Sequence, residues 1–132
     1  MLYAMFSLVL LTMIVILIGA RARISSVKQD TVPLNYYALM SGAEVPVFIR
    51  KTTRHVSNLF EVPVLFYTAG VVYLSLGMTD PLPVYCAWSY VGLRLVHTFI
   101  HLGYNNVLHR LLVFALSNIA LLAMWILIVT SQ

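Results

Sequence analysis

The sequence predicts an all-α integral membrane protein, folded over residues 1–132 as a single antiparallel bundle of four transmembrane helices. Composition is the first reason, because only 9% of the residues are charged, whereas a soluble domain carries about 25%. The second reason is that four apolar segments reach the roughly 20 residues needed to cross a bilayer. The third is that two of the three connections between these segments are short, which favours antiparallel neighbours.

The four predicted spans lie, in chain order, at residues 2–20, 56–77, 82–104 and 111–129. The first has no charged residue. We expect it to stay as an anchoring helix, because it lacks the basic leader of a cleaved signal peptide and its apolar run is longer than the usual signal core. In the second, Pro63 has no backbone N–H and is expected to bend the helix. The third span carries polar residues, and the fourth is apolar throughout except for short uncharged side chains.

Basic residues are concentrated in the one long connection, residues 21–54, which holds six of the eight Lys and Arg: Arg21, Arg23, Lys28, Arg50, Lys51 and Arg54. The second connection has none, and the third has Arg110. By the positive-inside rule we expect 21–54 to face the cytoplasm and both termini to lie on the other side. We therefore attribute the net charge of +4 to membrane orientation and expect no nucleic-acid partner. The four spans predict a multi-pass protein, in the inner or plasma membrane if the source is bacterial.

A first polar stripe opens the second span, where Arg54, Asn58 and Glu61 follow one another at spacings of four and three. At about 100° per residue, these side chains fall within about 60° of one another on a helix. A charge at membrane depth costs at least a few kcal/mol, so such residues are usually paired and usually functional. The stripe therefore predicts a functional site.

A second polar stripe lies on one face of the third span, at spacings i, i+4, i+7, i+11 and i+14: Tyr90, Arg94, His97, His101 and Tyr104. Arg94 is its deepest cation. Glu61 and Arg94 belong to antiparallel neighbours, and each needs a counter-charge in the membrane. We therefore expect these two residues to form an ion pair.

Together the stripes hold more cations and donors than acids, which predicts a cytoplasm-facing pocket for an anionic or zwitterionic ligand. No metal site is expected, because His97 and His101 lack an obvious third ligand. A haem held by histidines of two helices is an alternative. The single Cys86 excludes an intrachain disulfide and a dithiol redox motif. A chain this small has little room for an enclosed site, so we expect the polar groups inside the membrane to pair across subunits of an oligomer.

Two motifs resemble those of the MAPEG superfamily, membrane-associated proteins in eicosanoid and glutathione metabolism. RHVSNLFE (54–61) resembles the R-x-x-x-N-x-x-E signature of that family's second helix. RLVHTFIHLGY (94–104) resembles its third-helix stretch R-x-x-H-x-x-x-Y, closest to the prostaglandin E synthase branch, which stands beside the glutathione transferase branch. Arg110 falls at the position of the family's fourth-helix arginine, and GARAR resembles the basic end of its first helix. The resemblance extends over the whole chain.

The resemblance implies a homotrimer that binds glutathione as cofactor in a cytoplasm-facing, membrane-embedded pocket between protomers. It assigns glutathione binding to Arg21, Arg54, Asn58, Glu61, Arg94, His97 and Tyr104, and thiol chemistry to Arg110 and His101. A fixed cation lowers the pKa of a neighbouring thiol, normally about 8.5, by stabilising the thiolate. The thiolate would attack a lipophilic small-molecule substrate that arrives laterally from the lipid bilayer.

Two departures from the family pattern keep alternatives open. The family tyrosine four residues after the third-helix histidine is His101 here, and the serine that follows the fourth-helix arginine in some members is Leu111. The predicted function is a glutathione transferase or peroxidase-like membrane enzyme; the alternative is a glutathione- or lipid-binding member without significant turnover. A small four-span drug exporter is a third hypothesis, although such exporters use a carboxylate in the first helix and 2–20 has none.

Overall fold

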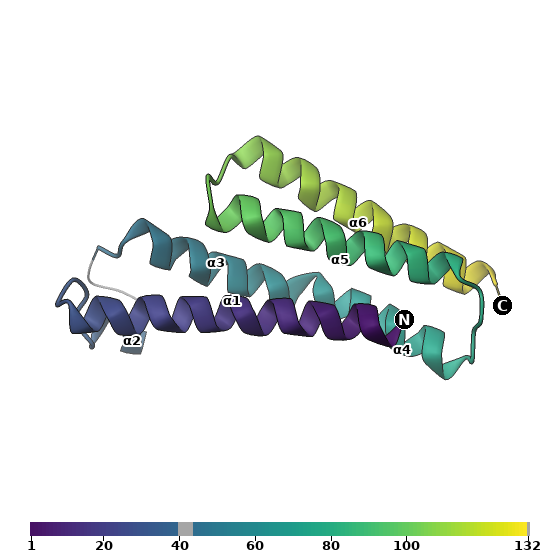
Figure 1. Ribbon diagram of the computed structural model, residues 1–132, viewed down its shortest axis with the longest axis horizontal. Helices are drawn as coiled ribbons and strands as arrows, with labels where there is room; N and C mark the ends of the chain where they lie inside the picture. Colours follow the sequence, from purple (N-terminus) through teal and green to yellow (C-terminus); the bar gives the residue numbers. More distant parts are fainter. Residues whose placement is uncertain (40–43, 132) are drawn as a thin grey trace.

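The structure is a computed structural model that describes residues 1–39 and 44–131 (Figure 1). Its regular elements are α1 (Leu2–Lys28), α2 (Tyr36–Leu39), α3 (Val47–Glu61), α4 (Pro63–Ser75), α5 (Leu82–Leu102) and α6 (Val107–Thr130). No strand occurs among the described residues, so the predicted all-α fold is confirmed.

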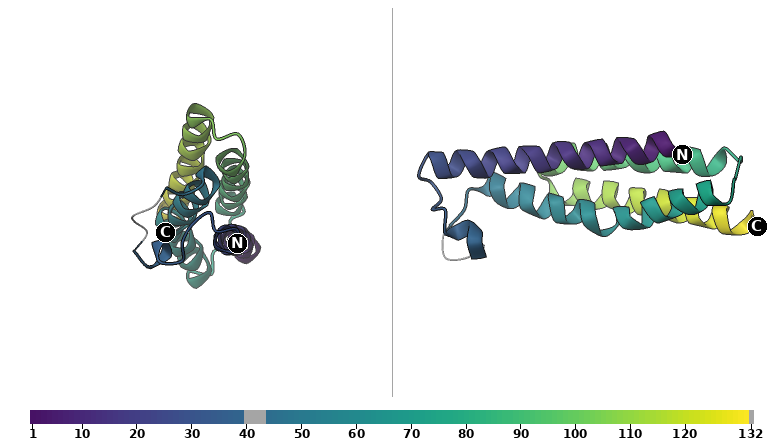
Figure 2. Two further views of the ribbon diagram at one scale, coloured as in Figure 1. Left: turned by 90° about the vertical axis from the view of Figure 1, so that its left-hand side faces the viewer. Right: turned by 90° about the horizontal axis from the view of Figure 1, so that it is seen from below.

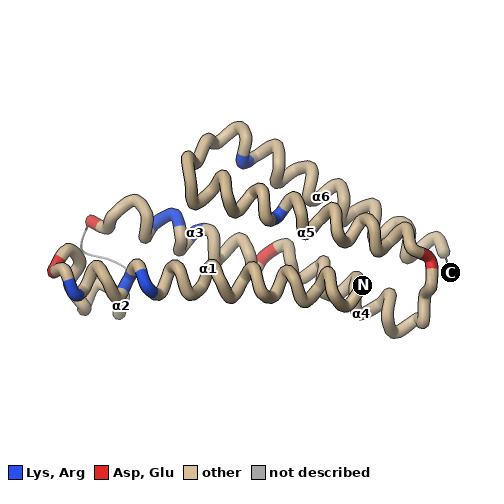
Figure 3. The backbone as a smooth tube through the Cα atoms, viewed as in Figure 1, with Lys and Arg blue, Asp and Glu red and all other residues tan. Residues whose placement is uncertain are grey.

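The long helices run side by side along a common axis and build an elongated bundle (Figures 1 and 2). α1 runs beside α3, the path reverses from α4 into α5, and α5 and α6 form an antiparallel hairpin. Both termini lie toward the same end of the bundle. Lys and Arg gather toward the opposite end, where α1 ends and α3 begins (Figure 3).

Three helical stretches are long and apolar enough to cross a membrane: Leu2–Lys28, Val47–Ser75 and Val107–Thr130. They coincide with the predicted first, second and fourth spans. α5 covers the predicted third span with 21 residues but is not among these three, because Arg94 and two histidines interrupt its apolar sequence. The described residues thus form an all-helical protein with three candidate membrane spans.

The helices extend well past the predicted ends of the spans. α1 continues to Lys28 and α3 begins at Val47, so much of the predicted 21–54 loop is helical; its residues 40–43 lie outside the described residues. The two extensions pack on each other, since Nη2 of Arg23 donates to Oγ1 of Thr53 at 3.0 Å. A helix does not have to end where its apolar stretch ends, because polar side chains on the extension remain solvated or pair locally.

Pro63 interrupts the helical path as the sequence predicts. α3 ends at Glu61 and α4 begins at Pro63, because the proline ring cannot donate to the carbonyl one turn back. Val62 between them keeps helical dihedral angles, φ −66° and ψ −36°, so α4 continues the path of α3. The indole N–H of Trp125 on α6 also donates to the carbonyl of Leu65 at 3.2 Å, which ties α4 to α6.

The apolar core lies between α1, α4, α5 and α6. Phe66 stacks on Tyr90, with ring centroids 4.7 Å apart. α1 approaches α4 closely at Gly70, where an added Cβ would lie 2.6 Å from the sulfur of Met5. Many large apolar side chains point outward instead, among them Phe6, Leu10, Val71, Phe99, Leu112 and Ile126. Such an outer surface suits helices that face lipid.

Candidate functional site

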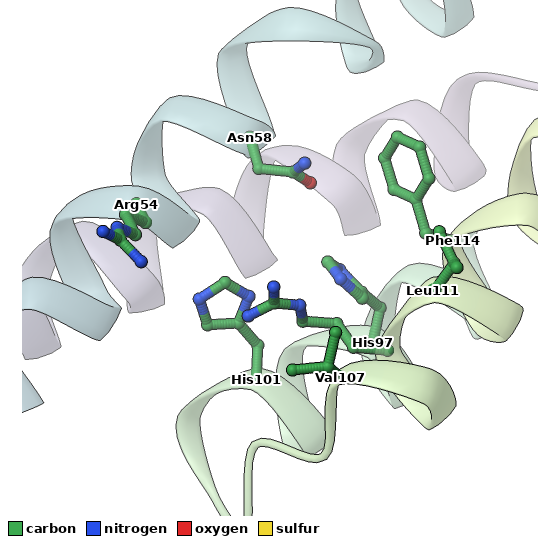
Figure 4. A pocket seen from close by; sticks show the side chains of 8 residues that line it. Arg54, Asn58, His97, His101, Val107, Leu111 and Phe114 are labelled. Carbon is green, nitrogen blue, oxygen red and sulfur yellow. The ribbon is translucent and has the colours of Figure 1, made fainter.

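A cavity of about 330 Å³ lies between α3, α5 and α6 in the basic half of the bundle (Figure 4). Its lining residues are Arg54, Asn58, His97, His101, Val107, Arg110, Leu111 and Phe114. The sequence had singled out five of these eight as site residues, from three separate helices. The structure therefore brings part of each predicted polar stripe together with Arg110 of α6.

α3 contributes Arg54 and Asn58, which lie one turn apart and so share a face. Arg54 is exposed, and Asn58 is half-buried. The Oδ1 atom of Asn58 accepts a hydrogen bond from Nη1 of Arg94 at 2.8 Å. The cavity wall on α3 is thereby tied to a cation that lies behind it on α5.

Arg94 is fully buried, with 0% of its surface exposed. Nε donates to the hydroxyl of Tyr90 at 3.1 Å, and the guanidinium carbon lies 5.2 Å and 5.1 Å from the ring centroids of Tyr90 and Phe114. Nη2 has no hydrogen-bond partner among the described residues. A buried cation whose partners are all neutral is costly to the stability of the fold.

The predicted ion pair between Glu61 and Arg94 is wrong for the two residues of one chain. Glu61 is the last residue of α3 and is exposed. Asn58 and Glu61 are three residues apart, so they differ by about 60° around the helix, and α5 packs against the Asn58 side. Arg94 therefore meets the amide of Asn58, while the side chain of Glu61 is exposed at the surface of the chain.

His97 and His101 are both buried, at 2% and 5% exposure, one turn apart on α5. A third imidazole, His55 of α3, is fully buried beside them and had not been selected from the sequence. Ring centroids are 4.7 Å apart for His55 and His101, 5.5 Å for His55 and His97, and 5.7 Å for His97 and His101. The spacing of His55 three residues before Asn58 is the signal that could have found it. We call these three residues the imidazole cluster.

The imidazole cluster has spare hydrogen-bonding capacity. Nδ1 of each of the three rings is buried without a partner among the described residues. Nε2 of His55 forms a hydrogen bond with Oγ1 of Thr98 at 2.8 Å. Within the part of the chain that the structure describes, no group of three or more His, Cys, Asp or Glu is placed to hold a metal ion.

Arg110 is held by the turn that precedes α6. Its Nη1 donates to Oδ1 of Asn105 at 3.0 Å, and Asn105 has a left-handed backbone with φ 52°, which asparagine tolerates better than most residues. Asn106 caps the helix by accepting from the backbone N–H of Leu108 and His109 at 3.0 and 3.1 Å. The guanidinium is thus positioned at the cavity by the start of α6, beside the apolar side chain of Leu111.

Three predicted site residues lie elsewhere in the single chain. Glu61 is exposed as described, and Arg21 lines a separate cavity of about 510 Å³ between α1 and the start of α3. Tyr104 was expected to continue the α5 stripe, but it lies beyond the end of the helix, is 58% exposed and bonds Nδ1 of His109 at 3.0 Å. The helix stops because Gly103 leaves the helical region, with φ −83° and ψ −117°.

The cavity wall has a clear chemical character. It presents two guanidinium groups, two imidazoles and one amide, and it has no carboxylate. Val107, Leu111 and Phe114 form an apolar side contributed by α6. Such a wall attracts an anionic, hydrogen-bonding ligand and leaves one side open to an apolar molecule.

Comparison with known proteins gives one match. A model described as the MAPEG family matches residues 1–130, nearly the whole chain. No curated protein and no solved structure matches significantly. The match is to the family as a whole, and the resemblance to its prostaglandin E synthase or glutathione transferase branch stays a prediction.

Proposed function

The chain belongs to the MAPEG family, and from this membership we propose that it binds glutathione in the cavity between α3, α5 and α6. The family makes it a membrane protein of glutathione or eicosanoid metabolism. In the proposed reaction, the bound thiol becomes a thiolate that attacks a lipophilic electrophile. The observation that carries the proposal is the carboxylate-free wall of two arginines, two histidines and an amide.

The charges of glutathione suit this wall. The tripeptide has two carboxylates, one ammonium group and one thiol. Arg54, from α3, lines the cavity and offers the charge-assisted donors that carboxylates bind best. A cavity of about 330 Å³ falls in the range of small-molecule sites, about 300–1,000 Å³.

One part of the ligand finds no partner in a single chain. The ammonium group requires a carboxylate, and the cavity wall has none, while Glu61 points outward from α3. We propose that the exposed Glu61 meets the ligand in the cavity of an adjacent protomer. A homotrimer with sites between protomers would also cover the outer face of the polar half of α3.

Arg110 is the proposed activator of the thiol. Guanidinium stays protonated in any protein environment, and a fixed cation beside a thiol favours the thiolate, which is the nucleophile. Leu111 and Phe114 lie next along α6 on the same cavity, and Leu111 is 61% exposed. A lipophilic electrophile could therefore reach the sulfur laterally from the bilayer.

We propose that α5 is a fourth membrane span. Its polar residues Arg94, His97 and His101 are buried inside the bundle, whereas Leu95 and Phe99 are 52% and 74% exposed. Sequence hydropathy averages both faces, so it undervalues a helix whose polar residues all point inward. With four spans, the basic end of the bundle faces the cytoplasm and both termini lie on the other side.

The test is calorimetry of glutathione binding to the purified protein in detergent, with Arg54→Gln as the site variant and Arg50→Gln as control. Arg50 is an exposed cation one turn earlier on α3 and does not line the 330 Å³ cavity. We expect saturable binding that Arg54→Gln weakens and Arg50→Gln does not. Absence of binding by the wild type would contradict the proposal. Binding without a thiolate signal would favour the alternative function, a glutathione-binding protein without significant turnover. That alternative arises because Leu111 replaces the serine found in some family members.

A further inference from the structure

Formation of a thiolate requires a group that accepts the thiol proton, and few side chains of the cavity wall can accept one. Two of its eight side chains are guanidinium groups, one is an amide and three are apolar. None of these accepts a proton near neutral pH. The two remaining side chains are the imidazoles of His97 and His101, whose unperturbed titration range lies near neutrality.

The two imidazoles differ in what they face. His97 lines the cavity of about 330 Å³, and its ring packs on Phe114 at a centroid distance of 5.9 Å. His101 also lines a second cavity of about 210 Å³, with Lys51 and Asn105, at the basic end of the bundle. His101 therefore lies between the glutathione cavity and a polar cavity nearer the expected cytoplasmic surface. A proton taken up by this ring has a polar route out of the site.

We propose that His101 accepts the thiol proton of bound glutathione. This inference rests on the proposed function and adds the fate of the proton to it. In the step, the S–H bond breaks, its electron pair stays on sulfur, and an N–H bond forms on the imidazole of His101. The products are a thiolate beside Arg110 and an imidazolium, and no other reactant is required.

His55 and Thr98 hold His101 in place. Thr98 donates its single hydroxyl proton to the carbonyl of Arg94 at 2.8 Å, so its oxygen accepts the bond from His55 and the proton of that bond belongs to Nε2 of His55. Nδ1 of neutral His55 is then a buried acceptor without a partner in the described chain. The fixed ring packs on His101 at 4.7 Å with an interplanar angle of 37°. His55 is thus a positioning residue for His101.

The cations around His101 make its protonation depend on the presence of the thiolate. α3 presents Arg50, Lys51 and Arg54, and α6 presents Arg110; all four line the second cavity with His101. On the inner side lie His55 and His97, and Arg94 is one turn beyond His97 along α5. These cations repel an imidazolium in the empty site. A thiolate formed in the same step supplies the missing negative charge, so the proton should stay on His101 while the thiolate is present.

The experiment counts protons during glutathione binding to the full-length protein. Calorimetry in two buffers of different protonation enthalpy gives the protons released, and thiolate absorbance in the ultraviolet gives the thiolate formed. S-methylglutathione, which has no thiol, corrects for protons moved by binding alone. For the wild type we expect a thiolate signal with almost no corrected proton release. About one proton released per thiolate formed, as simple linkage requires when no group retains it, would overturn the proposal.

Variants separate His101 from its neighbours. We expect His101→Gln to form less thiolate, or to release about one proton per thiolate to the buffer. His109→Gln, which changes an exposed histidine outside both cavities, should keep the wild-type pattern. A loss of proton retention in His97→Gln but not in His101→Gln would also overturn the proposal. If His101→Gln does not fold, release of about one proton per thiolate by the wild type would still overturn the proposal. Failure of glutathione to bind the wild type would instead overturn the proposed function itself, so the two failures are distinguishable.

Discussion

Nη1 of Arg94 donates to Oδ1 of Asn58 at 2.8 Å and thereby joins α5 to α3 across the inner wall of the cavity. The relationship is unusual because a fully buried cation is held by a neutral amide, with no ion pair to Glu61. It couples two residues that the sequence motifs place in different helices. Stability and ligand binding should therefore both depend on this contact.

Asn58→Leu should destabilise the protein by about 1.5–3 kcal/mol, the usual cost of losing a hydrogen bond to a charged group. The control is Ser57→Ala, whose hydroxyl is exposed and bonds only the carbonyl of Thr53, at 3.3 Å. Thermal unfolding in detergent measures both. Equal midpoints for the two variants would show that the contact contributes nothing. A double-mutant cycle with Arg94→Leu should give a coupling above about 0.5 kcal/mol.

Much of the site could be predicted from the sequence, because helical spacing fixes which residues of one helix share a face. Arg54 and Asn58, and likewise His97 and His101, needed only that spacing to be placed together. Rotation of one helix relative to another is set by packing, which spacing does not contain. For that reason the spacing predicts Glu61 as the partner of Arg94, whereas the structure places Asn58 there. The same limit hid His55, whose role depends on contacts with α5.

Helix ends were the other limit. The end of an apolar stretch marks where a segment leaves lipid, but it does not mark the end of the helix. α1 and α3 continue through polar sequence because their extensions support each other, as the Arg23–Thr53 hydrogen bond shows. Gly103, in contrast, ends α5 early because its backbone leaves the helical region, with φ −83° and ψ −117°. A Cβ in this conformation would lie 2.7 Å from the carbonyl oxygen of Phe99. The stripe that was extended to Tyr104 therefore stops at His101.

The topology predicts which ends of the bundle can be labelled from each side of the membrane. In a Cys86→Ser background, Ser131→Cys should react with an impermeant thiol reagent only from the non-cytoplasmic side. Gln29→Cys, at the basic end of α1, should react only from the cytoplasm. The reason is the concentration of Lys and Arg at that end. Labelling of Ser131→Cys from the cytoplasm would reverse the orientation.

The assembly is predicted to be a homotrimer whose sites use Glu61 of a neighbouring protomer. Native mass spectrometry in mild detergent should show mainly trimer, and a monomer alone would contradict the shared site. Glu61→Gln should weaken glutathione binding by about thirtyfold or more, because removing one partner of a buried charge pair costs about 2–5 kcal/mol. Glu44→Gln is the matched control, since Glu44 is exposed and precedes α3. Equal affinities of these two variants would remove Glu61 from the site.

The last prediction concerns the cation that stabilises the thiolate. Arg110→Ala should raise the pKa of the bound thiol while it changes glutathione affinity less, because Arg54 and Asn58 still hold the peptide. Each tenfold loss in thiolate stabilisation corresponds to about 1.4 kcal/mol. Arg21→Ala is the control: the resemblance also places Arg21 at the ligand, but within one chain it lines the other cavity.

Thiolate absorbance, titrated with pH at saturating glutathione, distinguishes the two arginines. A shift in Arg110→Ala alone assigns the thiol to the start of α6, next to Leu111 and the lipid-facing side from which an electrophile would arrive. A shift in Arg21→Ala alone would instead mean that the sulfur lies near α1 of a neighbouring protomer, since Arg21 is remote from the cavity in its own chain. In that case His101 would be too far from the sulfur to take its proton, and the protons counted on binding should appear in the buffer. The position of one cation therefore decides both the geometry of the thiol and the role of the imidazole cluster.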